Sequence, residues 1–279
     1  MATTEHGPLT VIEPVGGLVF PDLRELWRRR DLLYLMVRRD LTVRYKQSVA
    51  GALWAVLQPV ALAAVFSVFL GLLADVPSAA GIPYPVFALS GMVLWLFFTG
   101  ALTRSSDSTV SSSDLIAKVY FPRAAIPLAA SVGPVVDFAV AFVVVVAAVL
   151  VYGEPLGASL LLVPLIVPVV LAVALGSGLW LSALYVRFRD IGLVVPFMVQ
   201  VGLFMTPIIY PFSLVPDHLQ WLYGLNPMVG ALELYRWMVF PDAAWPGLVV
   251  LVPLIAGPVL LVSGAAFFER SQRGFADVI

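Results

Sequence analysis

The sequence has 279 residues, of which 61% are hydrophobic and 12% are charged, and its mean hydropathy is +0.99. Soluble domains are nearer half apolar and a quarter charged, so this composition predicts an all-α polytopic membrane protein. A net charge of −1 argues against a nucleic-acid partner, and the lack of cysteine excludes disulfides and thiolate chemistry. His6 and His218 lack the spacing of a metal site, so we expect no metal on this chain.

The chain begins with a polar segment, residues 1–21, that is rich in Pro and Gly and lacks the apolar core of a signal peptide. We expect this segment to be a cytoplasmic tail. Residues 22–48 then combine an apolar face with arginines at helical spacing, starting from a capping-box pair, Asp22 and Glu25. The pattern predicts an amphipathic helix that lies in the membrane interface. The alternative is a soluble helix that packs on a cytoplasmic partner.

Residues 49–279 form the predicted membrane domain. It contains six hydrophobic runs of about the 20 residues that a helix needs to cross a bilayer. They lie at Ala52–Leu73, Tyr84–Leu102, Ile126–Tyr152, Leu160–Val186, Leu193–Phe212 and Trp245–Phe268. In the fourth run Ala174, Gly178 and Ser182 recur at every fourth position, which predicts the close approach of another helix.

A polar, serine-rich stretch, Ser105–Pro127, separates the second run from the third. In this stretch Asp114 is placed to cap a short helix, and Pro122 prevents that helix from continuing. The apolar side chains of the short helix and its end are Leu115, Ile116, Val119 and Phe121. Because apolar side chains gain little in an aqueous loop, we expect this helix, at about 113–121, to dock into a soluble protein.

The distribution of basic residues predicts the orientation of the chain. If both termini are cytoplasmic, only Arg236 of the 16 Lys and Arg residues falls in an outer segment. The positive-inside rule therefore places both ends of the chain in the cytoplasm.

The outer segment Ser213–Ala244 contains two apolar helical pieces, Leu219–Leu225 and Met228–Val239, which are too short to cross a membrane. An Asn-Pro pair separates the two pieces. Glu233 and Arg236 are three residues apart and are expected to pair on one helix face. We predict a re-entrant hairpin here, with an ordinary outer loop as the alternative.

Three groups of residues are candidates for contact with a transported molecule. Arg44 and Lys46 have the charge to bind a pyrophosphate, although attraction to anionic lipids explains most basic residues of this region. Asp137 lies well inside a predicted span and is a candidate for proton transfer; since the spans offer no basic partner, we expect a protonated acid or a structural hydrogen bond. Aromatic residues that would stack on sugars in a channel, with membrane anchoring or core packing as the alternative, are Trp54, Phe66, Phe69, Trp95, Phe97, Phe98, Phe204 and Tyr210.

Several motifs, in matching order and spacing from about Asp22 to the C-terminus, resemble those of ABC-2-type permeases that export cell-surface polysaccharides such as O-antigen, capsule or teichoic acid. These motifs are Arg39-Asp40-Leu41, Arg44-Tyr45-Lys46-Gln47-Ser48, Gly51-Ala52-Leu53-Trp54, Gln58-Pro59, Asp114 to Arg123, Arg189-Asp190-Ile191, Asn226-Pro227 and Phe275-Ala276-Asp277-Val278-Ile279. Asp114 stands where the family often has asparagine, and both residue types cap helices.

The resemblance implies a homodimer in the bacterial inner membrane, with each copy bound to a separate ATPase subunit that holds ATP and Mg. The short helix would be the coupling helix of this complex. Residues expected at the contact with the ATPase are Asp114, Leu115, Ile116, Lys118, Val119, Tyr120, Phe121 and Arg123. The amphipathic helix would act as a gate, the outer hairpin would close the mouth, and a polyprenyl-diphosphate-linked glycan would pass between the protomers.

The two lysines of the chain, Lys46 and Lys118, do not lie in a phosphate-binding loop, so we expect no ATPase site on this chain. Other functions stay open. A drug or lipid exporter of the same family is compatible with the motifs. A proton-coupled secondary transporter needs ion or proton ligands at mid-membrane, for which only Asp137 is available. A membrane enzyme such as a glycosyltransferase needs paired acids or a metal cluster, which the pattern does not offer.

Overall fold

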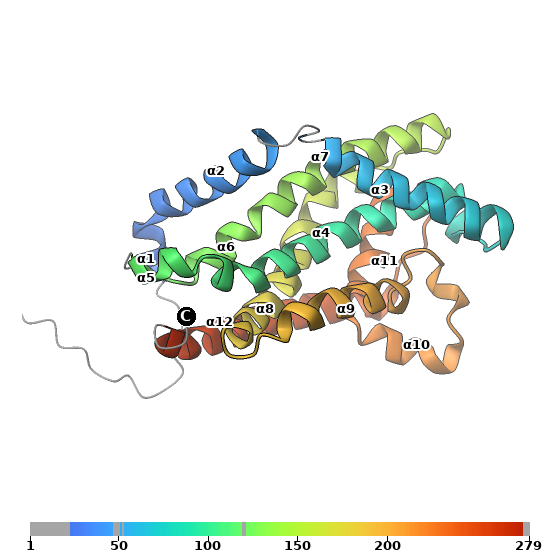
Figure 1. Cartoon of the computed structure of the whole chain (residues 1–279). Helices are drawn as coiled ribbons and strands as arrows, with labels where there is room; N and C mark the ends of the chain where they lie inside the picture. The colour runs from blue at the N-terminus through green and yellow to red at the C-terminus, as the bar shows by residue number, and fades with distance from the viewer. Residues whose placement is uncertain (1–22, 47–50, 52, 119–120, 276–279) are drawn as a thin grey trace, which may run out of the picture.

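The computed structural model describes residues 23–46, 51, 53–118 and 121–275, and all regular structure in these residues is helical. The predicted all-α fold is therefore confirmed. The α-helices are α1 (Leu23–Arg28), α2 (Arg30–Lys46), α3 (Leu53–Phe66), α4 (Tyr84–Ser111), α5 (Ser113–Lys118), α6 (Ala125–Ala130), α7 (Val132–Val151), α8 (Ile166–Arg187), α9 (Ile191–Met205), α10 (Asp217–Gly224), α11 (Pro227–Val239) and α12 (Leu251–Ser271). Figure 1 shows α1, α5 and the end of α12 at one end of the molecule and α10 at the other.

Five helical segments of the described chain are long and apolar enough to cross a membrane. They are Leu53–Leu73, Tyr84–Ser111, Ala125–Val151, Ala158–Arg187 and Gly247–Ser271, and they include the short turns η1 (Ser67–Leu73) after α3, η3 (Ala158–Leu165) before α8 and η5 (Gly247–Val250) before α12. The predicted fifth run corresponds to α9, which has 15 residues. Pro207 favours an extended Thr206, where the helix ends. A sixth crossing by α9 stays a prediction.

Helix α4 is the centre of the fold. It packs against α3, α6, α7 and α8, and most of its span is buried inside the protein. Val86, Phe87, Met92 and Leu94 are fully enclosed. The other helices therefore shield α4 on most sides, and α4 contributes several residues to the site described below.

The serine-rich stretch departs from the prediction. The second span does not end at Leu102, because α4 continues as one helix to Ser111. Ser105 and Thr109 are buried, and the Thr109 side-chain oxygen lies 2.6 Å from that of Ser182 on α8. Hydroxyls that bond a neighbouring helix, or carbonyls of their own helix, lie inside a protein at little cost. The polarity of this stretch was therefore a poor guide to where the span ends.

The close approach predicted for the small residues of the fourth run is confirmed. Ala174, Gly178 and Ser182 are all buried on α8. A Cβ at Gly178 would lie 2.6 Å from the Cβ of Ser105, so α4 and α8 touch where glycine leaves room. This contact joins the two helices near the end that carries α5.

The N-terminal helices pack on α6 through a small apolar cluster. Its buried members are Leu26, Met36, Phe121, Ala125, Ile126 and Ala129. Other apolar side chains of α1 and α2, among them Trp27 and Tyr34, remain exposed. One face of the predicted amphipathic segment thus rests on the membrane domain, and its placement in the membrane interface stays a prediction.

At the other end, the two helical pieces predicted for the outer segment are confirmed as α10 and α11. Asn226 caps α11 by accepting a hydrogen bond from the backbone N–H of Met228, at 3.0 Å. Helix α11 is buried among η3, α8 and α12, and at Gly230 a Cβ would lie 2.2 Å from the Val249 carbonyl oxygen. The depth of this hairpin in a bilayer stays a prediction.

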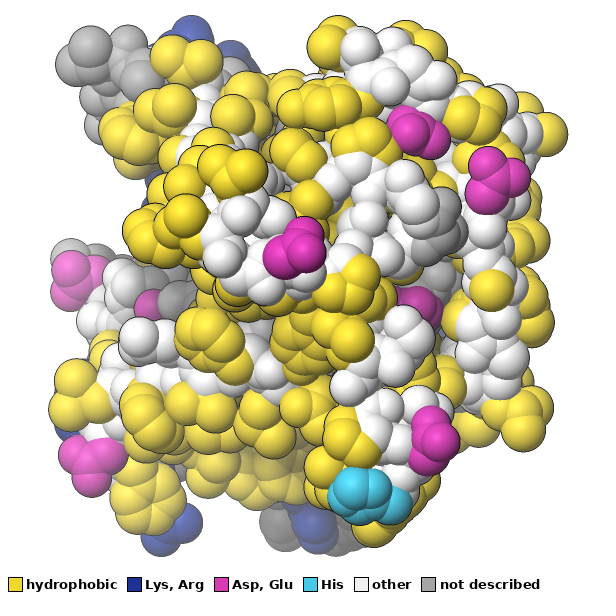
Figure 2. All heavy atoms as spheres, turned by 90° about the vertical axis from the view of Figure 1, so that its right-hand side faces the viewer, with side chains coloured by type: hydrophobic (Ala, Val, Ile, Leu, Met, Phe, Trp, Pro, Cys, Tyr) yellow, Lys and Arg dark blue, Asp and Glu magenta, His cyan; other side chains and the backbone are white. Residues whose placement is uncertain are grey.

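The predicted pair of Glu233 and Arg236 is confirmed at 3.1 Å. Arg236 is buried and also donates to the carbonyl oxygens of Pro207 and Ile208, at 2.6 and 2.7 Å. Its guanidinium carbon lies 3.8 Å from the centre of the Phe87 ring. Arg236 therefore ties the hairpin to the end of α9 and to α4. Figure 2 views this end, where acidic and hydrophobic side chains show and Lys and Arg appear only at the margins.

Candidate functional site

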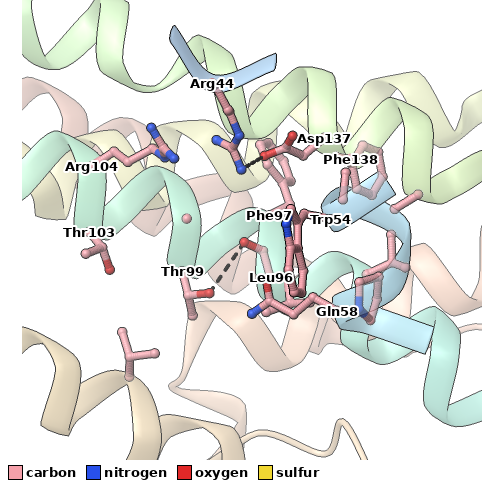
Figure 3. Close-up of a pocket in the computed structure, with 16 residues that line it drawn as sticks. Arg44, Trp54, Gln58, Leu96, Phe97, Thr99, Thr103, Arg104, Asp137 and Phe138 are labelled. Atoms are coloured by element: carbon pink, nitrogen blue, oxygen red, sulfur yellow. Dashed lines mark hydrogen bonds and ion pairs between the residues drawn. The ribbon is translucent and has the colours of Figure 1, made fainter. Parts of the chain in front are cut away.

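A cleft of about 400 Å³ opens between α2, α3, α4 and α7, with α9 touching its rim. Its polar lining comes from Arg44, Arg104 and Asp137, together with Gln58 and two threonines of α4. Its apolar lining includes Trp54, Phe97 and Phe138. Figure 3 shows the two arginines and Asp137 on one side of the cleft and the aromatic rings beside them.

Asp137 has a basic partner, contrary to expectation. Its Oδ2 atom pairs with Nη2 of Arg44, and its Oδ1 atom accepts a hydrogen bond from the Tyr45 hydroxyl at 2.5 Å. Since the partner comes from α2 and not from a span, the hydropathy pattern gave no sign of it. The expectation of an acid without a basic neighbour was wrong, and the expectation of a hydrogen bond is confirmed.

The Tyr45 hydroxyl stays protonated throughout the physiological range. Burial and, next, the hydrogen bond to Asp137 raise the pKa of Tyr45 to about 12. A protonated hydroxyl can donate to a carboxylate, and Asp137 thus accepts from two consecutive residues at the end of α2. These two contacts tie the end of α2 to α7.

The two predicted pyrophosphate candidates separate in space. Arg44 lines the cleft, whereas Lys46 is exposed at the last residue of α2 and is not among the lining residues. A second cation in the cleft is Arg104 of α4. The sequence argument did not single out Arg104, because this arginine lies between the second hydrophobic run and the serine-rich stretch.

The candidate channel aromatics also separate. Trp54 and Phe97 line the cleft, and Phe138, which was not singled out, lies beside Phe97 with ring centres 5.1 Å apart. Trp95 is buried in the main core and packs beside Phe98, with ring centres 5.4 Å apart.

Of the remaining aromatic candidates, Phe66 packs partly buried against the core. Phe69 and Phe204 are exposed on the outside of this chain, and the Tyr210 hydroxyl donates to the carbonyl oxygen of Phe204 at 2.7 Å. None of these four residues lines the cleft.

The predicted coupling segment is partly described. Asp114 is exposed in the first turn of α5, and Leu115 packs against the α1–α2–α6 cluster to which the buried Phe121 belongs. Arg123 donates to the carbonyl oxygen of Gln272, at the end of α12. Val119 and Tyr120, and the side chains of Ile116 and Lys118, lie outside the described residues. Contact with an ATPase stays a prediction for all of these residues.

No group of three or more His, Cys, Asp or Glu side chains that would hold a metal ion occurs in the part of the chain that the structure describes. The chemistry of the cleft is therefore that of two guanidinium groups, one carboxylate, hydroxyls and aromatic rings. Such a set can bind an anionic group and an apolar or ring-shaped one side by side.

The fold and the cleft define a class of protein: a multi-pass helical membrane protein with a charged cleft between its helices. Residues 31–240 match the family described as ABC-2 type transporter. Since this match covers most of the sequence, the chain belongs to the ABC-2 type transporter family, as its motifs predicted.

The chain is similar to relatives along almost its whole length. An O-antigen export system permease protein of Myxococcus xanthus is 30% identical over 261 residues, which cover 92% of this chain and 98% of the relative. A protein of the same name from Klebsiella pneumoniae is 28% identical over 251 residues, covering 89% and 95%. A polysialic acid transport protein of Escherichia coli is 25% identical over 241 residues, covering 84% and 91%.

Proposed function

We propose that this chain is the membrane-spanning permease subunit of an ATP-driven exporter that moves a lipid-linked cell-surface polysaccharide out across the bacterial inner membrane. One observation carries the proposal: the end-to-end similarity to a relative that is named as an O-antigen export permease, which covers 98% of that relative. O-antigen, capsule and teichoic acid are the cargo classes that fit.

ATP hydrolysis belongs to a separate partner. The chain has two lysines, neither in a phosphate-binding loop, so ATP and Mg are held by an ATPase subunit. Two copies of this chain form a homodimer that binds two such subunits. The docking element is α5 with the residues after it, because α5 lies at one end of the helices with Asp114 exposed.

Two contacts support a path for motion from α5 into the membrane domain. Only Ser112 separates α4 from α5, and α4 is joined to α8 through Thr109 and Ser182. Phe121, three residues beyond α5, packs with α1 and α2. A displacement of α5 would therefore act both on two central helices and on the gate helix α2.

In this mechanism the cleft takes the carrier end of the substrate. Arg44 binds the diphosphate of a polyprenyl carrier by charge-assisted hydrogen bonds, and Lys46 attracts it from the exposed end of α2. Trp54, which is exposed next to Arg44, offers a ring face to a sugar or an isoprenoid. The outer hairpin of α10 and α11 closes the exit, held by Arg236.

The proposal is tested by export in a strain that lacks its own permease of this class. The strain carries this chain, its companion ATPase and the enzymes for its polymer, and surface glycan is measured. We expect export to require both proteins and to stop when the lysine of the ATPase phosphate-binding loop is replaced. Export that follows the proton gradient and ignores the ATPase variant would contradict the proposal. Export of a drug or lipid but no glycan would assign the second candidate of the same family.

A further inference from the structure

Only one of the two terminal nitrogens of the Arg44 guanidinium group has a partner among the described residues. Its Nη2 atom pairs with Asp137, while its Nη1 atom is buried and has no hydrogen-bond partner among the described residues. Gly133 of α7 lies beside it, and a Cβ there would be in ordinary contact with Nη1, at 3.5 Å. A buried cationic donor without an acceptor is costly, so this geometry favours an additional anionic acceptor beside Arg44.

The charges of the cleft favour the same kind of ligand. Its lining holds two arginines, Arg44 and Arg104, and one acid, Asp137, which leaves an excess of one positive charge. A carboxylate offers two oxygens, and both oxygens of Asp137 are already used by Arg44 and Tyr45. A diphosphate offers more acceptor oxygens and more charge than a carboxylate, and its oxygens match the fork of a guanidinium group.

Asp137 is also a mechanical link. It lies on α7, and both of its partners are at the end of α2, the helix that forms one wall of the cleft. Loss of the ion pair would leave the hydrogen bond from Tyr45 as the remaining polar contact described between Asp137 and α2. Whether Asp137 is paired with Arg44 therefore affects how firmly α2 is held against α7.

We propose that Asp137 is a displaceable counter-anion: it holds Arg44 until a lipid-borne phosphate takes its place. The incoming phosphate bonds Nη1 and Nη2 of Arg44 and is attracted by Arg104. The carboxylate then keeps only the Tyr45 hydroxyl, so one of the two contacts between α2 and α7 is lost and α2 is held less tightly. This inference rests on the proposed function in one respect, that the phosphate belongs to a lipid-linked substrate.

The test uses the full-length chain in nanodiscs of neutral lipid, with farnesyl diphosphate as the probe and farnesol as the uncharged control. Binding and the amide hydrogen exchange of α2 are both measured. For the unaltered chain, we expect farnesyl diphosphate, and not farnesol, to raise exchange in α2. For Asp137→Asn, hydrogen exchange in α2 should already be high without the probe. The Kd for farnesyl diphosphate should fall about 5- to 10-fold, because the carboxylate that competes for Arg44 has been removed.

Two further variants keep the test decisive. Arg44→Gln should lose binding of the diphosphate. Tyr45→Phe keeps the ion pair but removes the donor that the displaced carboxylate would retain, so it should weaken binding of the diphosphate. It replaces Asp137→Asn if that variant fails to fold. Asp190→Asn, an exposed acid after α8, is the matched control and should change neither readout. Loosening of α2 in Asp137→Asn without tighter binding would overturn the proposal, since it would make Asp137 a purely structural link.

A second arm separates the two sources of phosphate. If nanodiscs with phosphatidylglycerol release α2 without any probe, an ordinary lipid headgroup displaces Asp137. If they do not, the displacement of Asp137 is specific to a diphosphate. The export assay and this test can fail independently. If the phosphate displaces Asp137 but no glycan is exported, the inference about Asp137 stands and the proposed cargo is wrong.

Discussion

The side-chain oxygen of Thr109 lies 2.6 Å from that of Ser182 in the buried contact between α4 and α8. Thr109 lies two residues before α4 ends and four residues before α5 begins. The hydrogen bond therefore joins two central helices close to the segment that we propose to receive force from an ATPase. It also gives the buried Thr109 hydroxyl a partner inside the protein.

Thr109→Val removes this hydroxyl and keeps the shape of the side chain. Hydrogen bonds between membrane helices contribute about 0.6 kcal/mol on average and at most about 1.7 kcal/mol. We therefore expect Thr109→Val to lower the free energy of unfolding by an amount in this range. Denaturation in mixed micelles measures it. The control is Ser111→Ala, which should be near neutral because the Ser111 hydroxyl donates to a carbonyl of its own helix, at 3.1 Å. Equal losses in the two variants would contradict the account.

The packing of α8 on α12 depends on two glycines. A Cβ at Gly176 would lie 2.5 Å from backbone atoms of Leu260 and Leu261, and a Cβ at Gly264 would lie 2.3 Å from the Gly176 carbonyl oxygen. Backbone atoms cannot yield as a flexible side chain does, so Gly176→Ala should destabilise the chain by about 1–3 kcal/mol. Thermal unfolding followed by tryptophan fluorescence measures this. Gly274→Ala, where no atom of the described residues lies within 4 Å of the added Cβ, should unfold like the unaltered chain.

Arg236→Met tests the outer hairpin. The change leaves Glu233 and the carbonyl oxygens of Pro207 and Ile208 without their donor in a buried site. Removing one partner of a buried ion pair costs about 3–5 kcal/mol, so we expect a large drop in the midpoint of thermal unfolding. Arg187→Gln, at an exposed arginine, is the control. A stable Arg236→Met protein would show that the hairpin does not depend on this residue.

Most of the helices follow from hydropathy and local signals. Runs of about 20 apolar residues predict the five long segments, and the Asn-Pro pair predicts where α11 begins, because asparagine caps a helix and proline fits its first turn. The end of α4 does not follow. Ser105 and Thr109 belong to a stretch with the composition of a loop, but α8 covers both: Ser105 packs at Gly178, and Thr109 bonds Ser182.

The site is less predictable than the fold because its parts come from distant segments. Arg44 and Asp137 were both singled out, but as unrelated residues, since nothing in a hydropathy pattern says that the end of α2 meets α7. Arg104 was not singled out, because it lies between the second hydrophobic run and the serine-rich stretch. An aromatic residue lines the cleft only if it lies on the helical face that borders the cleft. Trp54 lies on such a face, whereas Trp95 is buried in the core.

Trp54→Ala tests whether the cleft carries substrate. Aromatic contacts are worth about 0.5–1.5 kcal/mol beyond area, so the export rate should fall about 2- to 10-fold without loss of stability. The matched control is Tyr152→Ala: Tyr152 is an aromatic residue exposed to a similar degree, but it follows α7 and does not line the cleft. Equal export by the two variants would remove Trp54 from the substrate path.

The Tyr45–Asp137 hydrogen bond has a defined pH dependence. The pKa of Tyr45 in the folded chain is raised from 10.0 to about 12, so the neutral hydroxyl is favoured by folding. Its stabilisation is fully present below the usual pKa and is lost as the pH rises towards the raised one. The stability difference between the unaltered chain and Tyr45→Phe should therefore be constant at neutral pH and shrink in strong alkali. Urea titrations of both proteins over this range measure it, and a difference that grows with pH would contradict the assignment.

The most direct test of the account is a cross-link at α5. The chain has no cysteine, so Ser113→Cys places a single thiol at the first residue of α5 in the full-length protein. A bifunctional reagent is added to membranes that also contain the companion ATPase. We predict a cross-linked product of this chain with the ATPase that changes in yield when ATP is added. A thiol that reacts only with an impermeant reagent from outside the cell, or that never joins the ATPase, would contradict the central claim.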